Sequence, residues 1–393
     1  MKKILFYTTF LTQGGGIEVV TERYMEKLLA DGFKVDLYID YNMGEQNVRE
    51  KNINKKIKIK YLKPEKISKI IYYFRTQGKK NKLFNIPLYI LILVSDYIIW
   101  KKEIDNVKKE KYDATITFFQ FLPSYLTKVN GPKHFIFLHG SINKFFLGIR
   151  KYFKRKYFKK LNQFDYICTV SAEMGKELLE MEPSFKDKQI TLYNPIDFDE
   201  IKIKANDETN LSEKDKNLLK DKYICSVGRL DESQKDFTTL IKAYYELKID
   251  NLIEEKLYLI GDGPDKDKLQ YLVERLNLEE SIIFLGRKNN PYIWMKNSKL
   301  FILSSKYEGF PTVLVEALIL TVPILSSDCP TGPKEILGVE FKYDHLFKVG
   351  DINNLKNQIL LLINQDDNLL YKYMEKKLIK SSRVIFEIIN SEG

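Results

Sequence analysis

The sequence predicts an α/β protein with two domains, each built from parallel strands and connecting helices. The chain of 393 residues is longer than one ordinary hydrophobic core accommodates. An apolar strand pattern at residues 2–9, glycines at 14–16, an amphipathic helix at 17–31 and a strand at 35–39 form a βαβ opening. A second opening of this kind starts with a strand at 223–227.

Composition limits the class of protein. With 44% hydrophobic and 30% charged residues the chain is globular, and its net charge of +11 favours anionic partners such as nucleotides or lipid head groups. The three cysteines, Cys168, Cys225 and Cys329, are far apart and form no metal-binding pattern, so we expect a reducing cytosol. The apolar run at the N-terminus is brief and ends in glycines, which favours a strand over a signal peptide.

The remainder of the first half continues the strand pattern. We expect strands at 57–62, 114–119, 134–138 and 166–171, and a helix that ends at Met181. The segment 190–197 contains Asn194-Pro195, a pair that favours a turn. The first domain is therefore expected to end at residue 197.

Two stretches of the first half combine basic and aromatic residues. Residues 66–109 contain an apolar run whose Asn85, Pro87, Ser95 and Asp96 argue against a membrane-spanning helix. Residues 144–160 contain eight Lys or Arg and six Phe or Tyr. Both stretches are expected to lie on an anionic membrane surface. Two alternatives remain open: residues 66–109 cover the first sheet, and residues 144–160 form a solvated charged helix.

The second half begins with a polar linker at 202–222, in which we expect a helix. Strands are expected at 256–260, 282–285, 300–304 and 322–326. Helices are expected at 265–276, 292–297, 353–364 and 369–389.

The stretch SSKYEGFPTVLVEALILT at 304–321 predicts a strand end, a loop and a helix that is buried all round, with Pro311 in its first turn. Glu316 interrupts the apolar pattern, and a buried carboxylate needs a partner. Glu308 lies in the loop before the helix. Because helix N-termini attract anions while carboxylates bind hydroxyls, a nucleotide-sugar suits this arrangement.

The segment from Glu308 to Glu316 resembles the E-x7-E signature of the retaining glycosyltransferases of family 4. This resemblance implies the GT-B fold, in which two Rossmann-like domains face each other across a cleft and a C-terminal helix crosses back to the first domain. Residues 1–197, with a helix at about 376–393, would then bind the acceptor, and residues 198–375 the nucleotide-sugar. The resemblance is strong over 223–337 and weak in the first 200 residues.

The same resemblance assigns roles to single residues. Glu308 is expected to hold the donor sugar and Glu316 the ribose, while Arg229 and Lys235 in the G-R-L…Q-K pattern balance the charge of the diphosphate. His139 at a strand end is expected near the sugar and phosphate, although His-Gly stands here where many relatives have His-Asp. The further donor-binding residues implied are Gly15, Gly16, Gly228, Gly263, Gly286, Arg287, Tyr292, Phe310, Pro311, Thr312 and Val313.

The segment D-C-x-x-G-P-x-E-I-L at 328–337 is similar to a feature of transferases that extend lipid-linked or capsular oligosaccharides. Residue chemistry leaves two interpretations open. The segment is either a rigid structural turn or a contact to the donor sugar.

The resemblance implies transfer of a hexose or N-acetylhexosamine, with retained configuration, from a UDP-sugar to a polyprenyl-diphosphate-linked saccharide in bacterial glycan assembly. The Asp265-Lys266-Asp267 triplet falls in a predicted helix, so we expect no catalytic metal and no cofactor. The enzyme is expected in the cytoplasm, peripherally bound to the inner face of the cell membrane, without nucleic acid as a partner. A GT-B nucleotide-sugar 2-epimerase and a non-enzymatic basic protein that binds membrane or RNA remain alternatives.

Overall fold

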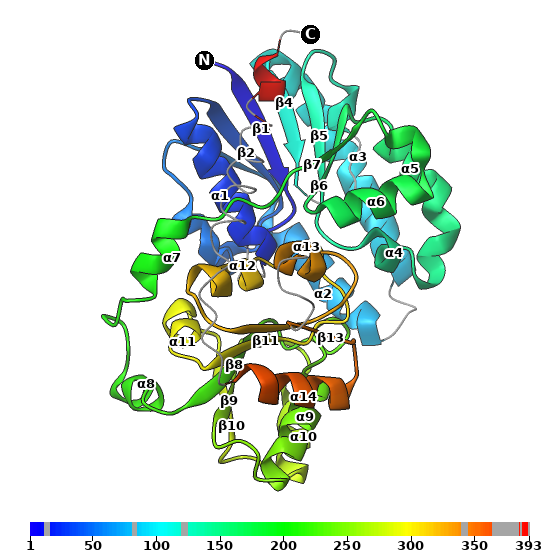
Figure 1. Cartoon of the computed structure of the whole chain (residues 1–393). Helices are drawn as coiled ribbons and strands as arrows, with labels where there is room; N and C mark the ends of the chain where they lie inside the picture. Colours follow the sequence, from blue (N-terminus) through cyan, green and yellow to red (C-terminus); the bar gives the residue numbers. More distant parts are fainter. Residues whose placement is uncertain are drawn as a thin grey trace.

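Two parallel β-sheets form the framework of the protein in a computed structural model (Figure 1). The structure describes residues 1–11, 16–80, 85–118, 125–338, 345–363, 385 and 387–391. The first sheet has seven strands in the order β3-β2-β1-β4-β5-β6-β7, and the second has six in the order β10-β9-β8-β11-β12-β13. In each sheet the order reverses beside the first strand, which is where doubly wound folds place their ligands.

The first sheet and its helices come from the first half of the chain. Its strands are β1 Lys3–Thr8, β2 Lys34–Tyr41, β3 Lys58–Lys63, β4 Ala114–Thr117, β5 Lys133–Leu138, β6 Tyr166–Thr169 and β7 Gln189–Thr191. Its helices are α1 Gly16–Ala30, α2 Glu65–Lys80, α3 Asn85–Glu110, α4 Ile142–Phe145, α5 Lys154–Leu161 and α6 Ala172–Met181. Short 3-10 helices span Gly44–Gln46, Val48–Asn52, Leu126–Lys128, Gly148–Phe153 and Pro183–Phe185.

The second sheet follows a connecting region with α7 Phe198–Lys204 and α8 Glu213–Leu218. Its strands are β8 Tyr223–Val227, β9 Lys256–Ile260, β10 Ile282–Gly286, β11 Leu300–Leu303, β12 Ile324–Ser327 and β13 Leu346–Phe347. Its helices are α9 Phe237–Ile249, α10 Lys266–Arg275, α11 Tyr292–Lys296, α12 Thr312–Ile319, α13 Pro333–Leu337 and α14 Ile352–Leu362. Helices α12 and α13 lie between the two sheets (Figure 1).

The described C-terminal residues return to the first half, beside the N-terminus of the chain (Figure 1). Ile385 and Ile389 are buried in the apolar core that contains the first sheet. The ammonium groups of Lys2 and Lys133 donate to the carbonyl oxygens of Ile389 and Ile388, at 2.6 and 2.7 Å. This is the crossing expected of the GT-B fold; the expected helical residues 369–384 lie outside the described part.

Helix α3 supports one of the two interpretations offered for residues 66–109, the cover of the first sheet, while the membrane contact stays a prediction. Its inner face packs on the first sheet, where Trp100 and Val107 are buried, while Tyr97 and Ile98 on its outer face are 61% and 62% exposed. Asp96 pairs at 2.6 Å with the buried ammonium group of Lys63 at the end of β3. Among the described residues, no helix is long and apolar enough to cross a bilayer.

Helix α12 differs from the prediction in two details. Pro311 precedes the helix as its N-cap residue, one position before the first turn. The helix is also not buried all round, because Thr312, Val313 and Glu316 are only partly covered while Leu314, Val315 and the residues from Ala317 to Ile319 are buried. The partly covered face borders a cleft. Because the helix carries apolar residues on nearly every face, its sequence does not show which face borders the cleft.

Candidate active site

A cleft of about 850 Å³ separates the two halves and is lined by residues of both. All four residues predicted to be catalytic line it, and they come from the three loops that follow β5, β8 and β11: His139, Arg229, Lys235 and Glu308. Of the predicted donor-binding residues, Gly16, Gly228, Arg287, Tyr292, Phe310, Pro311, Thr312, Val313 and Glu316 line it as well. Their roles toward a donor remain predictions.

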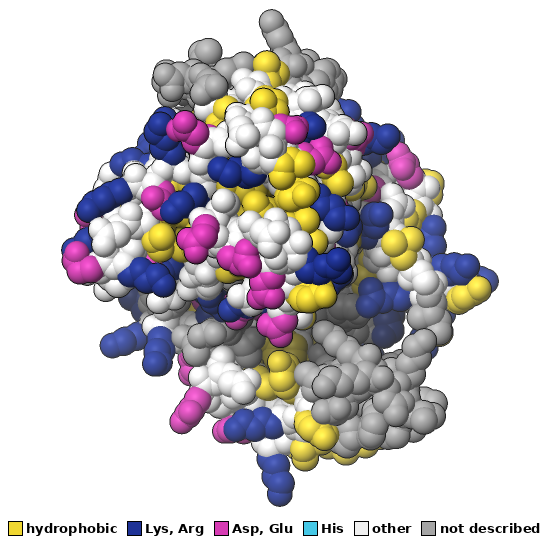
Figure 2. All heavy atoms as spheres, turned by 90° about the horizontal axis from the view of Figure 1, so that it is seen from below, with side chains coloured by type: hydrophobic (Ala, Val, Ile, Leu, Met, Phe, Trp, Pro, Cys, Tyr) yellow, Lys and Arg dark blue, Asp and Glu magenta, His cyan; other side chains and the backbone are white. Residues whose placement is uncertain are grey.

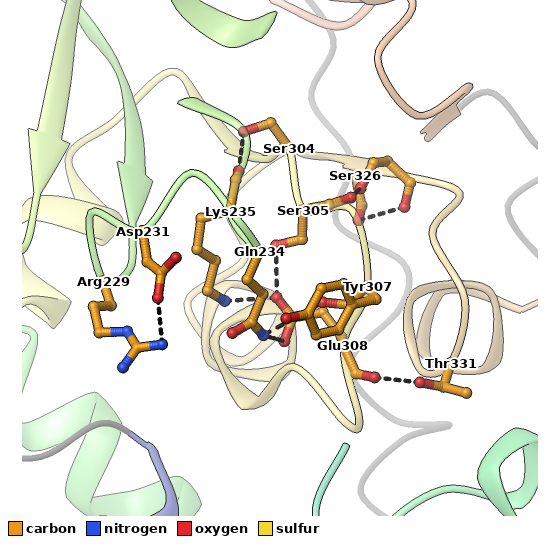
Figure 3. Close-up of polar contacts among 11 residues, drawn as sticks. Arg229, Asp231, Gln234, Lys235, Ser304, Ser305, Tyr307, Glu308, Ser326 and Thr331 are labelled. Atoms are coloured by element: carbon orange, nitrogen blue, oxygen red, sulfur yellow. Dashed lines mark hydrogen bonds and ion pairs between the residues drawn. The ribbon is translucent and has the colours of Figure 1, made fainter. Parts of the chain in front are cut away.

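Glu308 is held in place by a network of donors (Figure 3). Its carboxylate pairs with the Lys235 ammonium group at 2.6 Å and accepts hydrogen bonds from the Ser305 hydroxyl at 2.6 Å and the Gln234 amide at 3.2 Å. Its backbone carbonyl accepts from the Thr331 hydroxyl, and its N–H donates to the Pro330 carbonyl. A carboxylate with this many partners keeps one orientation.

Arg229 lies beside this network at the end of β8. Its guanidinium contacts Asp231 at 2.6 Å, and its side chain is 59% exposed (Figure 3). Lys235 is 15% exposed by the same measure. The pair therefore offers one exposed and one largely buried cation at the same wall of the cleft.

Glu316 has a partner from the opposite half. The Arg23 guanidinium of α1 lies 4.0 Å from its carboxylate and donates to the Tyr292 hydroxyl at 3.3 Å. Burial raises the pKa of Glu316 above its usual value, although Arg23 opposes this shift. Arg23 was not predicted, since nothing in the sequence of α1 indicates that it reaches across the cleft.

His139 is poised for a ligand contact. Its Nε2 is buried and has no hydrogen-bond partner among the described residues. Its ring lies against Phe118, with centroids 4.3 Å apart. Burial lowers the pKa of His139 to about 3, so the imidazole is neutral at physiological pH and offers either a donor or an acceptor, depending on its tautomer.

Two of the predicted glycines, Gly263 and Gly286, do not line the cleft, and the place of a third is not described. Gly15 lies outside the described residues. A Cβ at Gly263 would stand 2.4 Å from the Leu230 carbonyl oxygen, so this glycine allows two loops to pack closely. Gly286 ends β10 with φ +66° and accepts a hydrogen bond from the Gly261 N–H at 2.9 Å. Donor contacts of these residues stay untested.

The segment 328–337 stands behind the Glu308 loop rather than in the cleft wall. Thr331 and Pro330 bond the Glu308 backbone, and a Cβ at Gly332 would meet the Pro311 ring at 2.4 Å. These contacts favour the interpretation as a structural turn.

Several residues of the cleft wall escaped prediction. They are polar or charged, and they include Glu22, Glu26, Arg49, Asn194, Glu200 and Lys204. Asn194 was predicted only as a turn residue, yet its Oδ1 is buried without a hydrogen-bond partner among the described residues. Within the same part of the chain no three His, Cys, Asp or Glu side chains gather into a possible metal site.

Residues 207–382 match the family described as Glycosyl transferases group 1. This part of the chain is therefore similar to the domain of those transferases. The match confirms the resemblance at the level of the domain and leaves the subgroup open. It also agrees with the position of the cleft, whose nucleotide wall was predicted in this half.

Two curated relatives extend the comparison. A Campylobacter jejuni protein named N-acetylgalactosamine-N,N'-diacetylbacillosaminyl-diphospho-undecaprenol 4-alpha-N-acetylgalactosaminyltransferase is 37% identical over 185 residues, 47% of each chain. An uncharacterized glycosyltransferase of Haemophilus influenzae is 27% identical over 393 residues, 99% of this chain and 98% of that protein. The chain thus spans about half the length of the first relative and nearly all of the second.

Among solved structures, the crystal structure of Anabaena HepE in complex with UDP and glucose is similar over 100% of both chains, with a TM-score of 0.75 and 16% identity. An identity this low supports the fold alone. The prediction of a two-domain α/β fold of the GT-B type is confirmed.

Proposed function

We propose that the chain is a retaining glycosyltransferase that moves a hexose or N-acetylhexosamine from a UDP-sugar to a polyprenyl-diphosphate-linked saccharide. The observation that carries this proposal is the ion pair of Lys235 and Glu308, 2.6 Å apart at the cleft wall beside the N-terminus of α12. Cation, carboxylate and helix terminus together match the diphosphate and the hydroxyl groups of one ligand.

The departing UDP carries negative charge, which residues of the cleft must balance. Arg229, Lys235 and the first N–H groups of α12 balance the negative charge that gathers on the diphosphate. Glu308 orients the sugar hydroxyls, and Glu316 the ribose. His139, neutral and unpartnered at Nε2, offers a hydrogen bond to the sugar or its phosphate.

Retention follows from attack on the face that the diphosphate leaves. The bond from the anomeric carbon to the diphosphate oxygen breaks, and the acceptor hydroxyl oxygen bonds to that carbon. A diphosphate oxygen takes the hydroxyl proton. Glu308 is held by three donors, which suits hydrogen bonding to the sugar better than nucleophilic attack. The cations of the chain supply the charge balance, so we expect turnover to persist in a metal chelator.

The acceptor is the part of the proposal that rests on a relative. The name of the Campylobacter jejuni protein contains a diphospho-undecaprenol-linked saccharide. The chain's net charge of +11 is compatible with a diphosphate lipid at an anionic leaflet. A place in bacterial surface polysaccharide or glycan assembly follows from such an acceptor.

Surface side chains support a membrane-bound enzyme. Tyr72 and Tyr73 of α2, Tyr97 and Ile98 of α3, and Tyr152 of the segment 148–153 are 47–75% exposed. Asp96 of α3 acts electrostatically on Lys160 of α5, which brings both basic stretches into one region. Basic residues with exposed aromatic side chains suit an anionic lipid surface, and we propose that this region rests on the cytoplasmic leaflet.

A thermal-shift screen of nucleotides and UDP-sugars tests the donor. A ligand that binds the folded protein raises its melting temperature, so UDP and one UDP-sugar should raise it more than uridine does. Product analysis with that UDP-sugar then separates the alternatives. A new glycosidic bond supports the proposal, whereas an epimerised UDP-sugar formed without acceptor contradicts it. The absence of any nucleotide effect, with binding that falls steeply with salt, would favour a non-enzymatic basic protein.

A further inference from the structure

Two carboxylates, one from each half of the molecule, form hydrogen bonds with the start of a helix in the other half. Glu335 of α13 accepts hydrogen bonds from the N–H groups of Ala172 and Glu173, both at 3.0 Å. These are the first two residues of α6, whose N–H groups have no partner within their own helix. The Ser171 side chain satisfies the Met174 N–H, so the start of α6 is capped jointly by its own loop and by Glu335.

The contact is reciprocal. Glu173 of α6 accepts a hydrogen bond from the N–H of Gly332 at 2.7 Å, directly before α13. The Tyr193 hydroxyl donates to Glu335 from the end of the first half. Burial, more than the nearby charge of Glu335, raises the pKa of Glu173, and the Gly332 N–H opposes this shift. The two halves therefore exchange hydrogen bonds at their helix starts, because Glu335 accepts from α6 and Glu173 accepts from the residue before α13.

The exchanged hydrogen bonds connect directly to the predicted catalytic residues. Gly332 follows Thr331, whose hydroxyl bonds the Glu308 carbonyl. The same carbonyl accepts from the Ser141 N–H at 3.2 Å, and a Cβ at Gly309 would stand 2.1 Å from the His139 carbonyl oxygen. The separation of His139 and Glu308 thus depends on how closely the two halves approach here.

A second contact between the two halves lies in the cleft wall itself, where a ligand would meet it. Arg23 reaches Glu316 and Tyr292, and all three residues line the cleft. A ribose bound to Glu316 competes with Arg23. Glu173 and Glu335 lie outside the cleft wall, so a donor leaves their contacts intact.

We propose that Glu173 and Glu335 form an interdomain clasp, and that they act as positioning residues which hold His139 against Glu308 in the closed enzyme. This inference rests on the proposed function, since it assigns the clasp to the transfer step. Without the clasp, the second half still binds UDP. The approach of the two halves, and with it the geometry of the reacting groups, becomes loose.

The test compares Glu335→Ala, Glu335→Gln and Glu173→Ala with a control, Glu180→Ala, which removes an exposed carboxylate from the same helix α6. UDP affinity is measured by calorimetry, kcat and KM by UDP release, and the radius of gyration by X-ray scattering with UDP present. We expect unchanged UDP affinity, a larger radius and a kcat lowered about 100-fold in Glu335→Ala, because small misplacements of reacting groups have large effects on rate. Glu335→Gln should fall between this variant and the wild type, since an amide offers one acceptor where the two N–H groups need two.

The double variant Glu173→Ala/Glu335→Ala should be no slower than Glu335→Ala, because either change opens the same clasp. Wild-type kcat and radius in Glu335→Ala would overturn the inference, as would a loss of UDP affinity that matches the loss of kcat. If the wild type transfers no sugar, the proposed function fails, and the radius of gyration alone decides whether the clasp exists.

Discussion

The two halves of the molecule share one strand order but present different surfaces. In the second half, α9 and α14 bury Leu240, Leu355 and Ile359 in one core with the sheet. On the face of the molecule that is seen from below in Figure 2, acidic and basic side chains are mixed with apolar ones. In the first half, α3 buries one face and exposes Tyr97 and Ile98 on the other. In our proposal, one sheet topology therefore supports both a nucleotide-binding wall and a membrane-facing wall.

The largest expected effect is a loss of turnover when a cation of the second half is removed from the cleft. Arg229→Ala and Lys235→Ala should each lower kcat by about 100- to 1,000-fold, because each removes a cation from the developing charge of UDP. Steady-state UDP release measures this. Lys242→Ala, which removes an exposed lysine of α9, is the control and should retain wild-type turnover. Near-normal rates in both site variants would remove the proposed diphosphate contacts.

A buried ion pair in the first half can be matched with an exposed one in the second. Lys63→Met leaves Asp40 and Asp96 without their buried cation and should destabilise the first half by about 3 kcal/mol. Lys256→Met breaks the 2.9 Å pair with Asp221, where both side chains are about a third exposed, and should cost less than about 1 kcal/mol. Hydrogen exchange of the buried strands reports the free energy of opening for each half separately. Equal losses in the two halves would show that Lys63 does not anchor α3.

The membrane proposal predicts that exposed side chains of similar size contribute differently to vesicle binding, depending on the half in which they lie. Tyr97→Ser/Ile98→Ser should weaken binding to phosphatidylglycerol vesicles about tenfold, because two apolar side chains no longer enter the interface. Ile249→Ser/Tyr271→Ser changes comparably exposed residues of the second half and should bind as the wild type does. Sedimentation with vesicles measures both. Equal binding by all three proteins would place the membrane contact elsewhere or nowhere.

A further prediction concerns the pH dependence of stability. The pKa of His139 is lowered to about 3, below its unfolded value, so the unfolded chain binds a proton between pH 6.5 and 3 that the folded chain does not. Stability from this group is complete above pH 6.5 and falls as the pH falls, by about 2 kcal/mol at pH 5. His139→Gln should show a correspondingly smaller loss between pH 7.5 and pH 5 in urea unfolding. His134, whose pKa burial also lowers, contributes equally to both proteins. Parallel pH profiles of the two proteins would contradict a buried, neutral His139.

The second half was the easier one to predict. The strands expected at 223–227 and 256–260 are β8 and β9 residue for residue, because buried parallel strands bounded by glycine turns leave a continuous apolar signal. The strand β13 has two residues and leaves no such signal. In the first half, the mixture of buried and exposed faces on α3 blurred its apolar pattern. Periodicity therefore left two interpretations open. The buried face of α3 supports the cover of the first sheet, and membrane contact of the exposed face stays a proposal.

Contacts between residues that are far apart in the sequence could not be predicted at the site. Glu308 and Glu316 stand out because their spacing is a local pattern, and both line the cleft. Arg23 does not stand out in the sequence. Glu335 belongs to the motif at 328–337, but the motif does not reveal its partner, since Glu335 and Ala172 are 163 residues apart. Only the packing of the two halves brings such residues together.

Calorimetry of UDP and UMP binding tests the central claim most directly. If Lys235, Arg229 and the start of α12 bind a diphosphate, the wild type should bind UDP more tightly than UMP. This preference should disappear in Arg229→Ala/Lys235→Ala. Equal affinity for UDP and UMP in the wild type, or a preference that survives in the double variant, would contradict the account.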